Sequence, residues 1–398
     1  MNIIYELLAS SANLGKIKCG QEIKINVDLG LAHDGSMLKI IEEFKNLASD
    51  QYIICWDKLY VTVDHFLPAP DIKSRENYQM IKKFCEKYEI HLYDNGEGIL
   101  HQVIVEKFGN TLKDRIIVGV DGHMCTSAGL GAIPFSITAN EMVSVLTTGK
   151  YTLTVPKVIK IGLTGNFNYD NENKTKISGK DISLFLIKKL GSIELKNNAI
   201  LLCGDVLKQL SESQKMVIGN MLGEIGAKTV YFFEENRIDD DVYSFDVSEI
   251  TSFIVLPGSV ENIVSVQDVE EVKISQVYIG GCTNGRLDDM EQVAKVLLSK
   301  KIHHDITLII CPASRKIAND MDRLGYSQII RSSGGVIINP GCGACSGIHQ
   351  GVISKEDIIV TTTPRNTMGR MGDRRGQIYL ASPKVAAIFA IKGKITKI

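Results

Sequence analysis

The sequence lacks several features that would assign the protein to a specialised class. Its 45 Lys and Arg residues balance 46 Asp and Glu residues, so there is no basic excess of the kind that binds nucleic acid. No stretch approaches about 18 consecutive apolar residues, and the polar N-terminal segment has no signal-peptide pattern. Internal repeats and low-complexity segments are also missing. Since 44% hydrophobic and 23% charged residues are ordinary values, we predict a cytoplasmic globular protein.

The nine cysteines do not indicate a disulfide framework, because a long cytoplasmic chain rarely keeps disulfides. A single cysteine in an apolar run, such as Cys55 or Cys203, is expected to be simply buried. Three others differ: Cys282 lies in YIGGCTNGRLDDM, and Cys342 and Cys345 form a C-x-x-C pair in NPGCGACSG. Their small neighbours would let the backbone approach a bulky ligand and donate N–H groups to sulfur.

These three thiols leave three interpretations open. A structural zinc site usually has four ligands, but there is no second C-x-x-C and His349 is the only close histidine. Three protein ligands could instead hold a cubane iron–sulfur cluster with one open iron, which can act as a Lewis acid on a hydroxyl or water. The third interpretation is burial alone. The spacing favours the cluster without deciding the question.

The length predicts more than one domain, since single hydrophobic cores stop growing at about 250–300 residues. Short runs rich in Val and Ile alternate with amphipathic stretches, which predicts an α/β fold with mainly parallel sheets. We expect three α/β domains, at 1–155, 156–250 and 251–398. Buried strands are predicted in five stretches: DRIIVGVDGH, NAILLCG, AKTVYFF, SQVYIGGC and DITLIICPAS.

Three predicted strands end in residues that can do chemistry. VTVDHFLPAP carries Asp64 and His65, VGVDGHMC carries Asp121 and His123, and YIGGCTNG carries Cys282. Parallel α/β sheets bind ligands at the carboxyl ends of their strands, so we expect a site there. The alternative for the first two is an aspartate that caps a turn beside a packed histidine.

Periodicity predicts two helices near these motifs. The first, over 285–300, places apolar residues on one face: Leu287, Met290, Val293 and Val296. The second, over 213–229, places Asn220 and Glu224 four residues apart on one face. A solvated polar face would explain the second pair equally well.

Eight collinear segments spread over nearly the whole chain: VDHFLP, NGEGILHQVIVEK, GVDGHMCTSAGLGAI, GNMLGEIGAKT, IGGCTNGRLDDM, NPGCGACSG, PRNTMGRMG and IYLASPKVAAIFAIKGKIT. Together they resemble the aconitase family, and within it the large subunits of 3-isopropylmalate dehydratase and homoaconitase. One segment would carry little weight, whereas eight in the same order are specific. The resemblance implies three α/β domains around a cluster site, without the C-terminal swivel domain of single-chain aconitases.

The resemblance also implies a cofactor, a reaction and a partner. The cofactor is a [4Fe–4S] cluster held by Cys282, Cys342 and Cys345, with the fourth iron open to substrate. The reaction is that of a hydro-lyase, which dehydrates a hydroxy di- or tricarboxylic acid and rehydrates the alkene at the adjacent carbon. We expect 2- and 3-isopropylmalate, as in leucine biosynthesis; homoaconitate, citraconate and dimethylmalate-type substrates stay open. The partner is a small subunit, which supplies the proton-abstracting serine in a hetero-oligomer.

Such a dehydration needs an acid, a base and cations for the carboxylates. The resemblance assigns catalytic roles to six residues: Asp64, His65, His101, Asp121, His123 and Glu224. Asp64 and His65 are expected to protonate the leaving hydroxyl. The residues expected to contact substrate or to lie beside the cluster are Arg365, Arg370, Asn220 and Asn284. A guanidinium can bind a carboxylate bidentately, although most arginines are only solvated.

Two positions depart from the family pattern. Gly122 replaces a serine that contacts substrate, and Pro364 replaces an asparagine beside the cluster. Each change removes a hydrogen-bond donor, which costs about 1.5–3 kcal/mol when the acceptor is a charged carboxylate. A changed substrate, compensation by the partner or weakened activity would each account for them. The competing hypotheses are a non-catalytic iron–sulfur protein and a structural zinc protein. The two departures argue for the first, and the presence of Asp64, His65, His101, Asp121 and His123 argues against it.

Overall fold

The computed structural model describes residues 2–46, 56–167, 169–170, 175–191, 195–234 and 242–398, so Cys55 lies outside the described residues. The chain forms two compact units. Unit 1 consists of Met1–Asn95, Val103–Thr164 and Glu194–Phe245; unit 2 consists of Gly96–Gln102, Gly165–Ile193 and Asp246–Ile398. Among the described residues, no helix combines the length and apolar character needed to span a bilayer.

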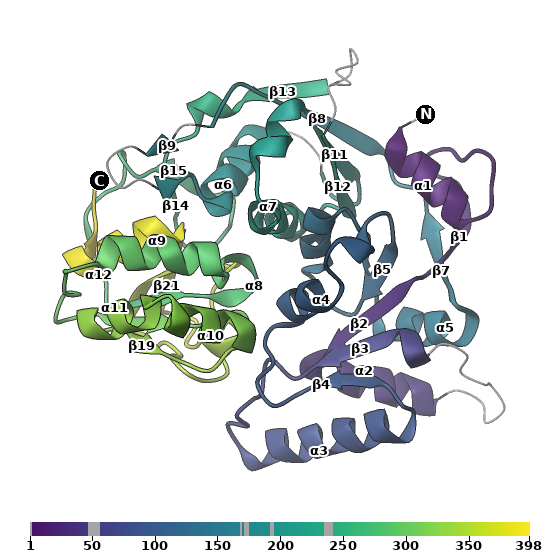
Figure 1. Cartoon of the computed structure of the whole chain (residues 1–398), viewed down its shortest axis with the longest axis horizontal. Helices are drawn as coiled ribbons and strands as arrows, with labels where there is room; N and C mark the ends of the chain where they lie inside the picture. Colours follow the sequence, from purple (N-terminus) through teal and green to yellow (C-terminus); the bar gives the residue numbers. More distant parts are fainter. Residues whose placement is uncertain (1, 47–55, 168, 171–174, 192–194, 235–241) are drawn as a thin grey trace. The chain divides into compact units, whose positions relative to one another are not determined.

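Unit 1 contains a five-stranded parallel sheet in the order β4-β3-β2-β5-β6. Its strands are β2 (Leu29–His33), β3 (Leu59–Thr62), β4 (His91–Tyr93), β5 (Ile116–Gly119) and β6 (Ile133–Ser136). The accompanying helices are α2 (Asp34–Lys45), α3 (Ile72–Lys87) and α5 (Ala139–Thr148). Because β2 is central and all strands are parallel, the carboxyl ends of β3, β2 and β5 lie next to one another (Figure 1).

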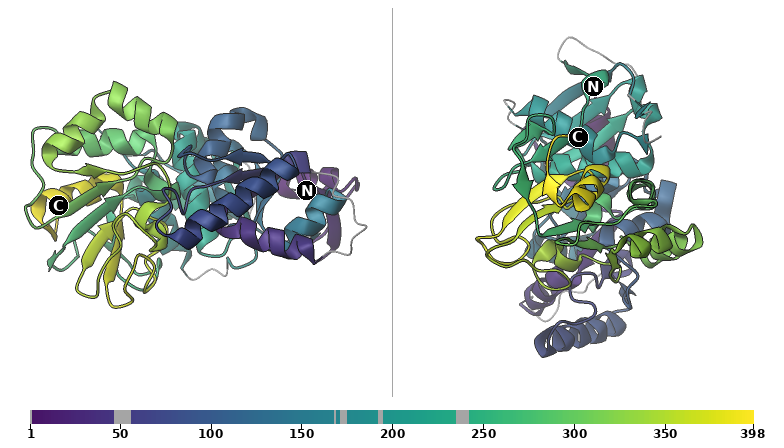
Figure 2. Two further views of the ribbon diagram at one scale, coloured as in Figure 1. Left: turned by 90° about the horizontal axis from the view of Figure 1, so that it is seen from below. Right: turned by 90° about the vertical axis from the view of Figure 1, so that its left-hand side faces the viewer.

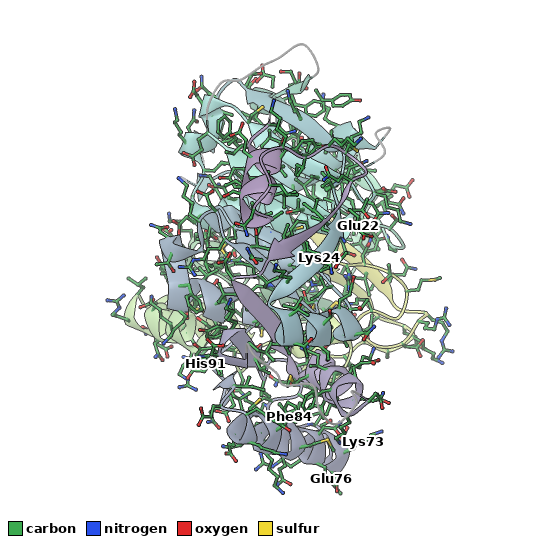
Figure 3. All side chains as sticks on the ribbon, turned by 90° about the vertical axis from the view of Figure 1, so that its right-hand side faces the viewer. Glu22, Lys24, Lys73, Glu76, Phe84 and His91 are labelled. Atoms are coloured by element: carbon green, nitrogen blue, oxygen red, sulfur yellow. The ribbon has the colours of Figure 1, made fainter. Side chains whose placement is uncertain are left out.

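Helix α3 shows why these segments are amphipathic. Phe84 packs edge-to-face on Phe44 of α2, with ring centroids 5.7 Å apart, whereas Glu76 on the same helix is exposed. Figure 3 shows Glu76 pointing away from the rest of the unit, and Glu22 and Lys24 on the outer strand β1 (Glu22–Asn26). Strand β1 pairs antiparallel with β7 (Lys150–Thr154) and alternates exposed and buried side chains, as a half-covered ribbon requires.

A second sheet of unit 1 has the order β12-β11-β8-β13. Its strands are β8 (Val158–Thr164), β11 (Ala199–Cys203), β12 (Thr229–Phe233) and β13 (Val242–Asp246). Its principal helix, α7 (Glu212–Glu224), begins at a capping box formed by Ser211 and Gln214. The first helix of the chain is α1 (Ile3–Ser11). Leu201 and Tyr231 share one apolar core with Val118 and Phe135, so the two sheets of unit 1 are packed together.

Unit 2 is built on a seven-stranded sheet in the order β15-β14-β21-β20-β17-β18-β19. Its strands are β14 (Phe253–Val255), β15 (Ile263–Ser265), β17 (Gln276–Ile279), β18 (Thr307–Ile310), β19 (Val336–Ile337), β20 (Ile358–Thr361) and β21 (Gln377–Ala381). The strands from β21 to β19 are parallel, and β14 and β15 are added antiparallel. A separate antiparallel pair is β16 (Val272–Lys273) with β22 (Lys394–Ile395).

The helices of unit 2 are α6 (Gly179–Leu190), α8 (Gly281–Asn284), α9 (Leu287–Leu297), α10 (Arg315–Arg323), α11 (Tyr326–Ser333) and α12 (Pro383–Lys392). Helix α4 (Leu100–Phe108) begins in this unit. Figures 1 and 2 show α12, in yellow, beside α9. Met290 and Val293 of α9 join Val385 and Phe389 of α12 in the core, because each helix turns its apolar stripe inward.

The predicted elements are confirmed. All five predicted strands form, as β5, β11, β12, β17 and β18, and the two predicted helices form as α9 and α7. The second helix is shorter than predicted, because α7 ends at Glu224 and Thr229 already begins β12. On α9, Val296 is buried and Leu287 is half-buried. Each of the three larger sheets lies inside one of the ranges 1–155, 156–250 and 251–398, and the three-domain division itself stays a prediction.

Candidate functional site

The strand ends of unit 1 bring together four side chains that can exchange protons. They are His33 and Asp34 after β2 and Asp64 and His65 after β3, and one ligand atom of each lies within 4.8 Å of the others. The His65 Nδ1 atom is 2.7 Å from Asp64 Oδ1 and 3.3 Å from Asp34 Oδ1. The rings of His33 and His65 stack with centroids 4.3 Å apart.

Asp34 holds the backbone around this group in place through hydrogen bonds to its carboxylate. Its side chain is 4% exposed and accepts three backbone N–H groups, from Gly35 at 2.9 Å, His65 at 3.2 Å and Phe66 at 2.9 Å. The turn after β3 is therefore tied to the start of α2, and the orientation of His65 depends on Asp34. A carboxylate already saturated by backbone donors is a poor metal ligand, so we interpret the group as an acid–base network.

The charges of this network support one another. Burial alone would lower the pKa of His33, but its hydrogen bonds to Asp121 and Asp34 raise it to about 9. Burial alone would raise the pKa of Asp34, yet hydrogen bonds from His33 and His65 hold it below its usual value. The Gly35 N–H lies 3.1 Å from His33 Nδ1 and 2.9 Å from Asp34 Oδ1. When His33 is charged, its Nδ1 carries a proton and cannot accept, so the Gly35 N–H then donates to Asp34.

A third strand end extends the network. His33 Nε2 lies 3.4 Å from Asp121 Oδ2, and Asp121 Oδ1 accepts the His123 backbone N–H at 2.5 Å. His123 Nδ1 is 3.5 Å from Asp121, and its Nε2 is 3.3 Å from Glu224 Oε2 at the end of α7. The structure therefore connects three predicted catalytic residues, Asp121, His123 and Glu224, with one another, and the contact between His33 and Asp121 joins them to the first group.

Close packing of α7 holds Glu224 and Asn220 in place. Asn220 is fully buried and donates to Thr126 Oγ1 at 2.8 Å, and Thr126 in turn donates to the His123 carbonyl at 2.6 Å. The close approach of α7 to the segment that contains Thr126 needs a glycine, because a Cβ on Gly219 would lie 2.3 Å from the Cys125 carbonyl oxygen. The short helix that contains Thr126, Met124–Leu130, therefore packs directly on α7.

His33 and Asp34 were missed by the sequence analysis. The signal was present, since LGLAHDGS has the same form as the other two motifs, an apolar strand followed by a histidine and an aspartate. Asp34 also begins a helix, where an acidic residue is common for reasons unrelated to catalysis. The predicted residue His101 belongs to unit 2 and is 7% exposed, so its place in the network stays a prediction.

Unit 2 holds the three predicted metal-ligating cysteines. Cys282 follows β17 on the short helix α8, and it is reached through Gly281, whose φ of +85° suits a glycine. Cys342 immediately precedes the tight turn Gly343–Ser346, and Cys345 lies within it. Gly343 is required there, because a Cβ would lie 2.6 Å from the Tyr278 hydroxyl.

All three cysteines interact electrostatically with one guanidinium, and one of them contacts it. Arg370 Nη2 lies 3.8 Å from Cys345 Sγ, and although burial opposes it, the three thiols raise the pKa of Arg370 above its usual value. Burial, with the neighbouring Cys311, Cys345 and Cys342, raises the pKa of Tyr278 well above its usual value. Tyr278 therefore keeps its proton and donates it to the Cys342 carbonyl at 2.9 Å.

The surroundings of these cysteines fit a polar inorganic group. Among the described residues, three buried polar atoms beside them have no hydrogen-bond partner: Asn284 Oδ1, Ser346 Oγ and Arg370 Nε. Cysteines that share one zinc would hold their sulfurs about 3.8 Å apart, given a Zn–S distance of about 2.3 Å and tetrahedral geometry. Within the described part of the chain, no set of ligand atoms within 4.8 Å of one another contains these three cysteines.

The other predicted residues lie around this set. Asn284 is fully buried and donates to Asp289 Oδ1 at 2.9 Å, so its amide nitrogen faces away from an external ligand. Arg365 is half-buried in the segment after β20. Pro364 is buried, and the carbonyl of the preceding Thr363 accepts a hydrogen bond from the fully buried Lys180 at 3.1 Å.

These features define a class: an α/β protein with an acid–base network at the strand ends of one sheet and a three-cysteine set at the end of another. The sequence matches the aconitase family (aconitate hydratase) over residues 10–245 and 259–393. The chain therefore belongs to the aconitase family and is a hydro-lyase.

Three similar proteins have these names. The methanogen homoaconitase large subunit of Methanocaldococcus jannaschii is 32% identical, with 100% of this chain and 99% of that protein covered. The 3-isopropylmalate dehydratase large subunit 1 of Methanopyrus kandleri is 33% identical, covering 98% and 97%. The 3-isopropylmalate dehydratase large subunit of Caldanaerobacter subterraneus subsp. tengcongensis is 35% identical, covering 97% and 96%.

Among solved structures, the holo-form of Thermococcus kodakaraensis aconitase X matches with a TM-score of 0.54. The alignment covers 95% of this chain and 97% of that one at 14% identity. At this identity the match supports the fold alone, which agrees with the predicted aconitase-like α/β architecture.

Proposed function

We propose that this chain is the large subunit of a [4Fe–4S] hydro-lyase that interconverts 2- and 3-isopropylmalate or a closely related hydroxy acid. The observation that carries the proposal is the electrostatic interaction of Cys282, Cys342 and Cys345 with the Arg370 guanidinium, which lies 3.8 Å from Cys345 Sγ. Three cysteine ligands beside a half-buried positive charge suit an anionic cluster with one open iron better than a four-ligand zinc site.

Cys282, Cys342 and Cys345 would hold the cluster, and the buried Ser346 hydroxyl would donate to one of its sulfides. A bound cluster with an open iron would supply a Lewis acid for the substrate hydroxyl. Arg370 would keep a positive charge beside the cluster. Arg365 and Arg370 would bind substrate carboxylates, since a guanidinium offers paired donors.

The proton-handling groups come from unit 1. Asp64 Oδ1 and His65 Nδ1 lie at a hydrogen-bond distance of 2.7 Å, and we assign to this pair the protonation of the leaving hydroxyl. Asp121, His123 and Glu224 form a second relay, with His101 and Asn220 assigned to the same function. Asp34 keeps His65 oriented, because the backbone and the ring of His65 both contact its carboxylate.

A small subunit completes the proposal. The relatives that match over their whole length are named large subunits, and the reaction needs a base for the α-proton in addition to the acid. We assign that base to the serine of a small partner. Without the partner, the chain should bind the cluster and show no turnover.

The first test is the metal content of the chain purified without oxygen. We expect about four irons and four sulfides per chain, lost in Cys345→Ser and kept in Cys203→Ser. Cys203 is a matched control, because it is buried in unit 1, where its thiol donates to the Ile161 carbonyl at 3.5 Å. One zinc per chain without sulfide would contradict the proposal.

The substrate is tested separately, because a homoaconitate-type acid is the second candidate. The M. jannaschii homoaconitase large subunit matches this chain as completely as the dehydratases do. Gly122→Ser and Pro364→Asn restore the donors of the family pattern. If the departures tune specificity, each should change the ratio of kcat/KM for the two substrates by roughly tenfold or more, the effect of one hydrogen bond to a carboxylate. No turnover on any hydroxy acid with a small subunit would favour a non-catalytic protein.

A further inference from the structure

The Arg286 side chain donates hydrogen bonds to three acceptors, one of them the Cys282 carbonyl, and the proposed chemistry does not use it. It follows Cys282 by four residues, precedes α9 and is only 4% exposed. Its Nη2 donates to the Cys282 carbonyl at 2.8 Å and its Nη1 to the Thr283 carbonyl at 2.8 Å. The side chain thus folds back on the backbone of the cysteine that it follows.

The third arm of the guanidinium reaches another part of unit 2. Arg286 Nε donates to Gln102 Oε1 at 3.1 Å, and Gln102 is 8% exposed and directly follows His101 on the first turn of α4. The start of α4 is also tied to this unit by the Ile99 N–H, which donates to the Ala313 carbonyl at 2.8 Å. Arg286 therefore links the Cys282 segment to the turn that carries His101.

The backbone of Arg286 is fixed from the other side. Its N–H donates to Asp289 Oδ2 at 3.0 Å, and the Asn284 amide donates to Asp289 Oδ1 at 2.9 Å. Asp289 is itself 4% exposed. Both oxygens of one carboxylate are thus used to hold the segment between Cys282 and α9, which leaves Arg286 little freedom to move.

We propose that Arg286 is a positioning residue that fixes the Cys282 ligand segment and the His101 turn relative to each other. The role rests on the proposed function in so far as Cys282 binds a cluster. It requires a planar fork with donors in three directions, which lysine cannot reproduce. Since Arg286 grips carbonyl oxygens, it restrains the backbone of Cys282 and does not occupy the sulfur.

The first experiment measures positioning without metal. Hydrogen exchange in the metal-free full chain should be at least tenfold faster in peptides covering 280–285 and 98–104 for Arg286→Met than for wild type. Arg286→Lys should recover only part of the protection. The matched control is Arg315→Met, because Arg315 is 46% exposed on its side chain and pairs with Glu97 in the same unit.

The second experiment measures the cluster. In protein reconstituted with iron and sulfide, we expect Arg286→Met to release iron to a chelator at least tenfold faster than wild type. After reduction with dithionite, it should also change the electron paramagnetic resonance signature of the cluster. Gln102→Leu removes only the third arm, so it should loosen residues 98–104 and leave iron release nearly unchanged. This variant keeps the test usable if Arg286→Met folds poorly.

The outcomes separate the two proposals. Unchanged exchange at both segments in Arg286→Met would overturn the positioning role, whatever the metal content. Faster exchange together with a wild type that binds neither iron nor sulfide would support the positioning role and refute the cluster. Faster exchange with unchanged iron release and an unchanged signature would overturn the link between Arg286 and the cluster.

Discussion

Asp34→Asn is the sharpest perturbation of the acid–base network, because it changes the charge and one acceptor with almost no change in size. The carboxylate accepts backbone N–H groups on both oxygens, from Gly35 on Oδ1 and from His65 and Phe66 on Oδ2. An asparagine can keep an acceptor at only one of these positions, and its amide would face donors at the other.

The cost follows from this geometry. At least one buried backbone N–H loses its acceptor, at about 1–3 kcal/mol, and the remaining bonds lose the strength that a charged acceptor gives. The favourable interactions of the carboxylate with His33 and His65 are lost as well. We therefore expect the free energy of unfolding to fall by roughly 2–4 kcal/mol.

The assay is urea unfolding at pH 7, combined with hydrogen exchange of the peptide that covers 60–67. The control is Asp322→Asn, since the Asp322 side chain is 60% exposed and an exposed ion pair contributes little. A loss below about 1 kcal/mol for Asp34→Asn, with unchanged exchange of that peptide, would refute the organising role of Asp34.

Three further predictions use single contacts. Because the pKa of His33 is raised from 6.5 to about 9, the stability that protonated His33 contributes is complete below pH 6.5 and is lost as the pH rises through 9. The free energy of unfolding of wild type should fall by roughly 3 kcal/mol over that range, and that of His33→Gln should fall much less, as urea unfolding at each pH would measure. Gly219→Ala forces α7 off a backbone carbonyl and should cost about 2–4 kcal/mol, whereas Gly191→Ala, with no contact under 3.6 Å, should be nearly neutral; equal effects would contradict the packing argument. Glu224→Gln should lower turnover of the complete enzyme on the order of 10²–10⁴-fold, whereas Glu212→Gln at the exposed start of the same helix should not, as steady-state kinetics would measure.

Much of the fold was predictable because parallel sheets leave strong local signals. Each predicted strand is a short apolar run, and burial on both faces makes such runs continuous, so β5, β11, β12, β17 and β18 could be assigned without tertiary information. The same rule placed Asp64 and Asp121 at the carboxyl ends of strands in one sheet and Cys282 at the carboxyl end of a strand in another.

Other features could not be predicted, because they depend on which strands are neighbours. The sequence does not indicate that β2 lies between β3 and β5, and only this order makes His33 and Asp34 the centre of the network. The burial of Arg286 could not be predicted either, because an arginine just before a helix is usually exposed to solvent. In the fold, its side chain is buried against two carbonyl groups and Gln102.

The two sets of residues are held by different means, and the difference matches their proposed tasks. In unit 1, side chains fix side chains: Asp34 and Asp64 orient the His65 ring, because a proton donor must point at its target. In unit 2, Tyr278 donates a hydrogen bond to the Cys342 carbonyl and Arg286 donates one to the Cys282 carbonyl. These bonds restrain the backbone of the two cysteines and do not act on their sulfur atoms. A metal ligand set needs this arrangement, because each thiolate must still adjust to the cluster while its segment stays in place. Mutations of the carbonyl-gripping residues should therefore affect how firmly metal is kept, and mutations around Asp34 should affect the pH dependence and the rate of the reaction.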